Sequence, residues 1–329
     1  MDPKTLGLVG GVLLLLAGGT AVVQVLRGRV DSGIDPAILE TFRLRVRAWW
    51  VLFAVLVAAL LLGRAATVVL FGLISFWALR EFITLTPTRP GDHRTLFWVF
   101  FLWTPLQFVL VGMENCWLFD ENHWAYVGMQ SYDLYSILVP VYAFLFILAR
   151  VAMAGDYKRF LERTAKIQAG LLVCVYCLSY APALLTLELP DAGWAPKALL
   201  LFFFVLIVQL SDALQYAWAQ IPSKHVIVPT INPNKTWEGL LGGTASVTLL
   251  GAALWWATPF SVPVAALMSL VIAVMGFAGG LTLSAIKRDR GVKDYGTLVE
   301  GHGGVLDRID SMCFAAPIFF HFTRMWLNT

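Results

Sequence analysis

Charged residues are concentrated in one short stretch near the carboxyl end of the chain, between Ser284 and Ser311. Ten of the 27 positions from Ser284 to Asp310 are charged, whereas 14% of the whole chain is charged and 59% is hydrophobic. The ten residues are Lys287, Arg288, Asp289, Arg290, Lys293, Asp294, Glu300, Asp307, Arg308 and Asp310. A loop that only connects apolar segments needs a few basic residues, so this density of acids and bases favours a chemical role.

The acids in this stretch have the spacing of a metal site. Asp307 and Asp310 are three residues apart, so a helix would place both carboxylates on one face. Mg²⁺ takes hard oxygen ligands of this kind and usually shares them with substrate phosphates. The alternative is a basic loop whose acids only balance its charge.

The other polar residues of the stretch suit a phosphate. Basic side chains can donate charge-assisted hydrogen bonds to phosphate oxygens, and four are available here: Lys287, Arg288, Lys293 and Arg308. The run His302-Gly303-Gly304 offers backbone that a phosphate can approach without meeting a Cβ atom. Together the two sets predict a metal-and-phosphate site.

The order of these residues resembles the signature of the phosphatidate cytidylyltransferases, also called CDP-diacylglycerol synthases. The matching positions are Ser284-x-Ile-Lys287-Arg288-x4-Lys293-Asp294-x-Gly296 and His302-Gly303-Gly304-x-x-Asp307-Arg308-x-Asp310. The family usually has an aliphatic residue followed by Pro or a small residue shortly before the His, where this chain has Val299 and Glu300. The extra acid bears on which lipid the protein prefers.

A second polar segment, from Ser211 to Gly239, also resembles the family. Asp212 lies near the end of an apolar run, where an ionisable group is costly unless it is paired or functional. Asn232 or Asn234 with Lys235-Thr236 can begin the next helix, whose first N–H groups could bind a phosphate while Glu238 supplies an acid. Ordinary helix capping explains the same spacing. The resemblance to the family's S/N-P-x-K-T-W-E/Q-G segment favours the functional interpretation.

The resemblance implies transfer of a cytidylyl group from CTP to phosphatidate, giving CDP-diacylglycerol and pyrophosphate. It implies metal-ligand candidates at Asp212, Asp294, Asp307 and Asp310, and phosphate-binding candidates at Lys235, Lys287, Arg288, Lys293 and Arg308. Further substrate-binding candidates are Ser211, Asn234, Thr236, Glu238, Ser284, His302, Gly303 and Gly304. The expected cofactor is Mg²⁺, with K⁺ as an example of a second cation. The expected partners are CTP, phosphatidate or a related lipid phosphate, and membrane lipids, with no nucleic acid; a homodimer is left open.

Long apolar segments must position these residues. The chain has 329 residues, thirteen tryptophans and a mean hydropathy of +0.74, which indicates an all-α polytopic membrane protein. We expect about ten spans, at Leu6–Leu26, Ala48–Gly63, Ala65–Phe82, Leu96–Met113, Leu134–Ala149, Ile167–Leu187, Ala198–Trp218, Leu240–Thr258, Val262–Leu283 and Met312–Trp326. They form one integral membrane unit, with N-terminal helices over residues 1–166 and a catalytic region over residues 167–329.

The segments between the spans carry secondary predictions. Only Arg64 separates the second span from the third, which implies a very tight hairpin. Residues 114–131 are rich in Trp, Tyr and Asn, as is typical of a membrane interface, and the basic amphipathic segment 156–166 is expected to form an interfacial helix. Cys174 and Cys177 lie in an apolar run and are interpreted as packing residues rather than as a metal or redox pair.

The basic residues predict the orientation. If the amino terminus faces outside, all of the 24 basic residues except Lys4, Arg64, Lys197 and Arg324 fall on one side of the membrane. Basic loops face the cytoplasm, so the polar site is expected at the cytoplasmic ends of the C-terminal helices of a bacterial inner-membrane protein. Two alternatives remain. One is a cytidylyltransferase for a different lipid phosphate. The other is a membrane transporter, but transporters place charges within broken helices near the middle of the membrane, and the spans of this chain are almost free of charge.

Overall fold

The computed structural model describes residues 36–86, 88–113, 131–189, 193–221, 225–296 and 303–328, together with positions 7, 10, 11, 13, 17, 18, 20 and 21. Most of the predicted first span, most of the predicted interface segment 114–131, the family departure Glu300 and the site candidate His302 lie outside the described residues.

The first part of the described chain is a series of helices that often join without a break. Its elements are α2 (Pro36–Leu62), α3 (Arg64–Thr84), η1 (Pro90–Asp92), α4 (His93–Trp98), η2 (Val99–Trp103), α5 (Thr104–Gly112), α6 (Ser131–Ile137), η3 (Leu138–Ala143) and α7 (Phe144–Ala152). Since only Gly63 separates α2 from α3, the predicted tight hairpin is confirmed.

The second part contains the longer uninterrupted helices. Its elements are α8 (Phe160–Leu171), η4 (Leu172–Cys177), α9 (Leu178–Ala183), η5 (Leu184–Thr186), α10 (Trp194–Trp218), α11 (Trp237–Ala253), η6 (Trp255–Ala257), α12 (Val262–Asp289) and α13 (Leu306–Leu327). α12 continues six residues beyond the predicted span, and α13 begins six residues before it. Several predicted loop residues, Lys287, Arg288, Asp307, Arg308 and Asp310 among them, therefore lie on helices.

Six helical stretches of the described chain are long and apolar enough to cross a membrane. They are Arg64–Thr84, Pro90–Gly112, Tyr132–Ala152, Phe160–Thr186, Trp194–Trp218 and Val262–Asp289. Each contains one of the predicted spans or most of it. The protein is therefore all-helical over the described residues and suited to a membrane, while the total of ten spans stays a prediction.

The interfacial helix predicted at 156–166 is wrong. Residues 160–166 are instead the beginning of α8, which continues into the sixth predicted span. Arg163 of this segment is buried, its Nε donates to both carboxylate oxygens of Asp92 at 3.2 and 3.0 Å, and its Nη1 donates to the carbonyls of Asp156 and Lys158. The charge is thus neutralised inside the protein, which removes the reason for this segment to lie flat on lipid headgroups.

The two neighbouring cysteines take part in packing. Cys174 is a buried free thiol within η4, and Cys177 is a partly buried one at the end of the same wide turn. The hydroxyl of Ser75, on α3, donates to the carbonyl of Cys174 at 2.7 Å and so satisfies a backbone group within the wide turn. This arrangement agrees with their interpretation as packing residues.

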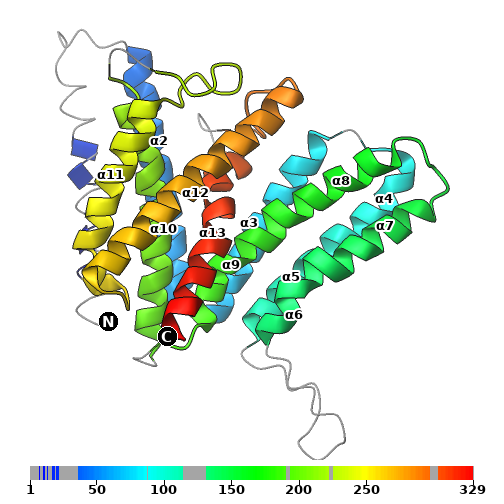
Figure 1. The fold of residues 1–329 in the computed structure, drawn as a ribbon, viewed down its shortest axis with the longest axis horizontal. Helices are drawn as coiled ribbons and strands as arrows, with labels where there is room; N and C mark the ends of the chain where they lie inside the picture. Colours follow the sequence, from blue (N-terminus) through cyan, green and yellow to red (C-terminus); the bar gives the residue numbers. More distant parts are fainter. Residues whose placement is uncertain are drawn as a thin grey trace, which may run out of the picture.

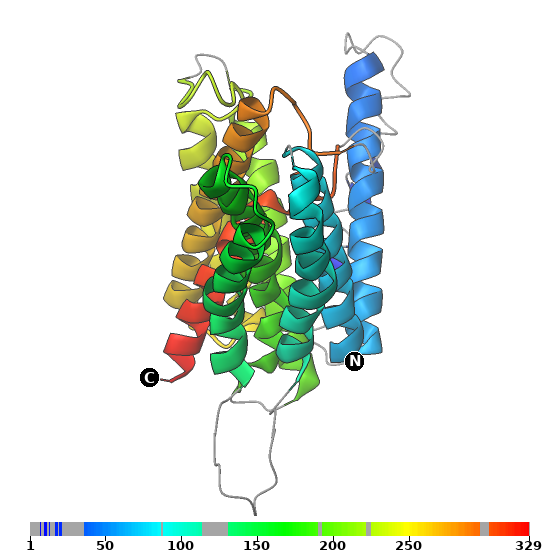
Figure 2. The ribbon, with the colours of Figure 1, turned by 90° about the vertical axis from the view of Figure 1, so that its right-hand side faces the viewer.

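The helices pack side by side into a bundle (Figure 1), with α2 along one edge (Figure 2). The last four long helices pack closely in pairs, α10 on α11, α11 on α12, and α12 on α13, and α3 also contacts α13. The segment 225–236 and the turn that follows α12 lie at the same end of the bundle (Figures 1 and 2). Both polar segments of the sequence therefore meet at one end.

Candidate active site

Two carboxylates from different helices converge on one hydroxyl group. Ser311, on α13, is buried, and its Oγ donates to Oδ1 of Asp212 at 2.8 Å and lies 3.5 Å from Oδ1 of Asp310. The backbone N–H of Ser311 also donates to Oδ1 of Asp310 at 2.8 Å. Asp212 lies on α10, 98 residues before Asp310, so the packing of α10 on α13 creates this pair.

Lys235 brings a positive charge to the same place. A Cβ atom on Gly280 of α12 would lie 3.4 Å from Nζ of Lys235 and 3.6 Å from Oδ2 of Asp310. The ammonium group also lies over the ring of Phe277, 4.8 Å from its centroid. Because Gly280 has no Cβ atom, a small space remains at this point on the surface of α12. The ammonium of Lys235 and the carboxylate of Asp310 border that space.

The backbone around Lys235 is held by a short antiparallel bridge between Val226 and Thr236. The N–H of Ile227 donates to the carbonyl of Lys235 at 3.0 Å, and the N–H of Trp237 donates to the carbonyl of His225 at 2.9 Å. This bridge fixes the segment immediately before α11 and thereby positions the lysine.

Thr236, rather than an asparagine, caps α11. Its Oγ1 accepts a hydrogen bond from the N–H of Gly239 at 3.0 Å. The predicted caps Asn232 and Asn234 lie before the helix, where Oδ1 of Asn232 accepts from the N–H of Asn234 at 3.1 Å. The asparagines instead shape the turn that precedes the bridge, since an Asn side chain readily bonds the backbone two residues on.

Glu238 faces His225 rather than the carboxylate pair. Both of its carboxylate oxygens accept from the N–H of His225 at 3.1 Å, and Oε1 lies 2.6 Å from Nδ1 of the ring. The hydrogen bond with the His225 side chain lowers the pKa of Glu238 to about 2. The carboxylate is therefore ionised at neutral pH, and in the first turn of α11 its charge is favourable to the helix.

Ser284 and Arg288 tie α12 to the turn before the bridge. The hydroxyl of Ser284 donates to the carbonyl of Gly280 at 2.6 Å and accepts from Nδ2 of Asn232 at 3.3 Å. Nε of Arg288 donates to the carbonyl of Ile231 at 3.0 Å. These two family-matched residues hold the segment that carries Lys235 against the end of α12.

Asp307 accepts hydrogen bonds from three donors of the chain itself. Its Oδ1 accepts from Nζ of Lys287 at 2.7 Å, and its Oδ2 accepts from the N–H groups of Tyr295 and Gly304 at 2.8 and 2.9 Å. The carboxylate is 6% exposed and the lysine 13%. Of the two acids that the sequence places three apart, Asp307 thus holds the chain between α12 and α13, whereas Asp310 faces Lys235.

The glycines of the predicted phosphate loop pack against acids. Gly303 has a φ of +81°, which favours glycine, and a Cβ there would lie 3.2 Å from Cβ of Asp294. Asp294 and Lys293 are exposed. Among the described residues, Gly303 is therefore lined by Asp294 and Asp307 and Gly304 by Glu81, and the role of the loop toward phosphate stays a prediction.

Glu81 of α3 is a component of this region that sequence reasoning missed. Its Oε1 accepts from the N–H of Val305 at 2.9 Å, and its Oε2 accepts from the N–H of Leu306 at 2.8 Å. The side chain is 5% exposed, and a Cβ on Gly296 would lie 2.8 Å from Oε1. Glu81 thus occupies the N–H groups at the start of α13, the groups that in other proteins attract anions. The sequence did contain a signal for this role, because Glu81 is an acid within the predicted apolar span Ala65–Phe82, where an ionisable residue is usually functional or paired.

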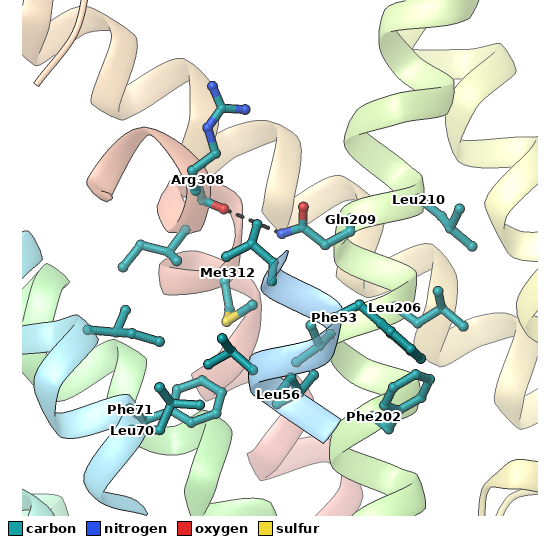
Figure 3. Close-up of a pocket in the computed structure, with 15 residues that line it drawn as sticks. Phe53, Leu56, Leu70, Phe71, Phe202, Leu206, Gln209, Leu210, Arg308 and Met312 are labelled. Atoms are coloured by element: carbon teal, nitrogen blue, oxygen red, sulfur yellow. Dashed lines mark hydrogen bonds between the residues drawn. The ribbon is translucent and has the colours of Figure 1, made fainter. Parts of the chain in front are cut away.

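Arg308 lies on the side of α13 that meets α10, near enough to Asp212 for their charges to interact. Its backbone carbonyl accepts from Nε2 of Gln209 at 3.4 Å, and Figure 3 shows its guanidinium above a group of apolar side chains. Ser211, adjacent to Asp212, accepts from Nε2 of Gln215 at 2.9 Å. The family-matched polar residues of α10 thus face α12 and α13.

The carboxylate pair is compatible with a divalent cation. No group of three or more His, Cys, Asp or Glu side chains within the described part of the chain is arranged to hold a metal. Mg²⁺, however, is commonly bound through one or two carboxylates with the remaining ligands from substrate phosphates. Asp212 and Asp310 provide such a pair beside the open volume at Gly280, while Asp307 is engaged with Lys287 and Asp294 lies beside Gly303.

The sequence has relatives over almost its whole length. A family model described as "Cytidylyltransferase family" matches residues 43–326. The chain is 36% identical over 288 residues to a protein of Escherichia coli (strain K12) named "Uncharacterized protein YnbB", which covers 85% of this chain and 87% of that protein.

Proteins named "Phosphatidate cytidylyltransferase" match over shorter stretches. The protein of Staphylococcus aureus (strain COL) is 38% identical over 120 residues, 36% of this chain and 46% of its own length. The protein of Mycobacterium leprae (strain TN) is 34% identical over 174 residues, 52% of this chain and 53% of its own length. The chain thus spans about half the length of these two relatives.

Proposed function

The chain belongs to the cytidylyltransferase family, and we propose that it transfers the cytidylyl group of CTP to phosphatidate. Family membership makes the protein a nucleotidyltransferase, which replaces the transporter alternative. The observation that best supports the proposal is the convergence of Asp212, Asp310 and Lys235 around the open volume at Gly280.

The proposed reaction forms one phosphorus–oxygen bond and breaks another. A phosphate oxygen of phosphatidate attacks the α-phosphorus of CTP, and the bond from that phosphorus to the oxygen that bridges to the β-phosphate breaks. The products are CDP-diacylglycerol and pyrophosphate. The lipid phosphate is already an anion near neutral pH, so the protein does not need a strong general base. Its tasks are alignment of the two phosphates and neutralisation of their charge.

The residues around Gly280 suit these tasks. We assign Asp212 and Asp310 as the carboxylates that would hold Mg²⁺, which when bound supplies positive charge to the phosphates. Lys235 is assigned to a CTP phosphate because its ammonium borders the same volume. Lys287 is assigned a structural role in addition to its predicted phosphate contact, since it holds Asp307. K⁺ as a second cation stays part of the proposal.

A first experiment measures product formation by the purified protein in mixed micelles of detergent and lipid phosphate, with CTP and Mg²⁺. We expect CDP-diacylglycerol and pyrophosphate in equal amounts from phosphatidate, with no product when CTP is replaced by ATP. A well-folded protein that binds CTP but does not turn over phosphatidate would contradict the proposed substrate.

A different lipid phosphate is a second candidate substrate. A relative that matches 85% of this chain is not named for phosphatidate, whereas the two relatives described above that are named for it match 36% and 52% of the chain. The same assay, run with a series of lipid phosphates that differ in backbone, decides between the two. Turnover of another lipid phosphate at a kcat/KM tenfold or more above that of phosphatidate, on the order used to separate specific substrates, would favour this second candidate.

We further propose that the end of the bundle with the site faces the cytoplasm of a bacterial inner membrane, where CTP is available. The expected bias of basic residues supports this orientation. In a cysteine-free variant, a cysteine at exposed Lys293 should react with a membrane-impermeant maleimide only in inside-out vesicles. Reaction in right-side-out vesicles alone would reverse the orientation. Whether the protein is a homodimer is to be measured in the same detergent preparation.

A further inference from the structure

An apolar pocket lies next to the candidate active site, between α2, α3, α10 and α13 (Figure 3). Its volume is about 170 Å³. Thirteen of its fifteen lining residues are apolar, and the two polar ones are Gln209 and Arg308. Pockets of this kind, apolar with a few polar groups at one place, are typical ligand sites.

The polar end of the pocket adjoins the site. Arg308 lies between Asp307 and Asp310 on α13, and Nε2 of Gln209 donates to its carbonyl (Figure 3). The guanidinium in Figure 3 points away from the apolar lining. In the other direction the pocket reaches Phe202, seven residues before Gln209 on α10, which corresponds to about 10 Å along a helix.

The apolar end calls for an apolar occupant. Close-packed protein interiors have few voids larger than a water molecule, and apolar cavities stay dry and accept apolar guests. Leu52 and Val55, on the wall formed by α2, are each 45% exposed, so among the described residues the pocket is open on the side of α2. In a membrane, that opening admits a lipid chain.

Apolar contact alone cannot select which lipid enters. Lipid tails are as apolar as leucine, so a chain gains no hydrophobic free energy when it leaves the bilayer for the pocket. Selection must therefore come from the headgroup and from the shape of the walls. A guanidinium is well suited to bind a phosphate, and Arg308 places one at the polar end.

We propose that this pocket binds one acyl chain of the lipid-phosphate substrate, with the phosphate toward Arg308, and that its walls select chain length. The inference rests on the proposed function and adds to it the path of the substrate. The lipid enters between α2 and the rest of the bundle, and its acyl chain moves in first, along α10. The pocket thereby fixes the phosphate at the depth of Asp310.

Filling the pocket tests the proposal by activity. We expect Leu56→Trp to lower kcat/KM for dihexadecanoyl phosphatidate by about tenfold or more, with little change for the dihexanoyl form, whose tails are short. The matched control is Leu61→Trp on the same helix, at a leucine that is 66% exposed and does not line the pocket. Equal losses for both chain lengths, or losses in the control as large as in Leu56→Trp, would overturn the proposal.

Enlarging the pocket is a second variant, for the case that a larger residue prevents folding. Phe202→Ala lengthens the apolar end and is expected to shift the preferred chain toward longer acyl groups in a competition assay read by mass spectrometry. An unchanged product distribution in a folded variant would contradict the role of the walls.

Photo-crosslinking tests the pocket without turnover. A phosphatidate with a diazirine on one acyl chain should label peptides that contain Leu56, Phe202 or Met312, and excess unlabelled phosphatidate should reduce that labelling. Labelling spread evenly over exposed positions such as Leu61, or displaced equally by phosphatidylcholine, would show ordinary bilayer lipid and overturn the proposal. Specific labelling without any turnover would instead leave the pocket in place and refute the proposed reaction.

Discussion

Replacing Asp310 by asparagine should reduce turnover by about 10²–10³-fold, the loss typical of removing one preorganised electrostatic contact. The amide keeps the shape of the side chain but removes its charge, so the pair with Asp212 loses half of its negative charge. Stability should be retained or raised, because two carboxylates that converge on Ser311 repel each other in the absence of ligand. Turnover and thermal unfolding measured in the same detergent separate the two effects.

The matched control for this prediction is Asp289→Asn. Asp289 lies at the end of α12 near the same end of the bundle, but its carboxylate is 65% exposed and forms an ion pair with the neighbouring Arg290. We expect turnover within about twofold of the wild type, since substitutions of exposed surface residues usually have little effect on the stability of the folded protein. Turnover of Asp310→Asn within threefold of the wild type would remove Asp310 from the catalytic assignment.

Replacing Glu81 by alanine should lower the free energy of unfolding by about 3 kcal/mol, since two hydrogen bonds to a buried charged group are lost. The N–H groups of Val305 and Leu306 would then lack their acceptor at the start of α13. Because Asp307 and Asp310 lie in the first turns of that helix, turnover should fall as well, through lost positioning. Urea- or heat-induced unfolding in detergent measures the first effect.

Two further variants distinguish positioning from mere destabilisation. Glu81→Asp keeps the charge with a shorter reach and should recover part of the turnover that Glu81→Ala loses. Glu81→Gln keeps one acceptor oxygen, and its turnover should lie between those of Glu81→Ala and the wild type. Glu188→Ala, at an exposed glutamate far along the chain from this contact, is the control and should leave both measurements unchanged. A fully active, fully stable Glu81→Ala protein would refute the role given to this residue.

Much of this architecture could be predicted from the sequence because its signals are local. Apolar length marks the spans, and the lone Gly63-Arg64 step marks the hairpin between α2 and α3. The family-matched residues Asp212, Lys235 and Asp310 were expected to act together, and the helices do bring them to one place.

The remaining features depend on contacts that local pattern does not encode. The partner of Glu81 lies 224 residues away, and nothing near either residue indicates the other. The different hydrogen-bond partners of Asp307 and Asp310 also depend on contacts between distant residues. Three-residue spacing predicts that both lie on one helix face, but it does not predict that Lys287 donates to Asp307. The interfacial-helix prediction failed because the partner of Arg163, Asp92, belongs to η1, 71 residues earlier in the chain.

The contact between Glu81 and α13 also has a consequence for synthesis. A ribosome adds about 5–20 residues per second, so roughly 11–45 s separate the emergence of Glu81 from that of Val305 and Leu306. During that interval α3 carries an acid whose later hydrogen-bond donors do not yet exist, and an unpaired acid is costly within a bilayer. Closure of the polar end is therefore among the last steps of biogenesis, and a chain that stops before residue 305 leaves Glu81 without these two donors.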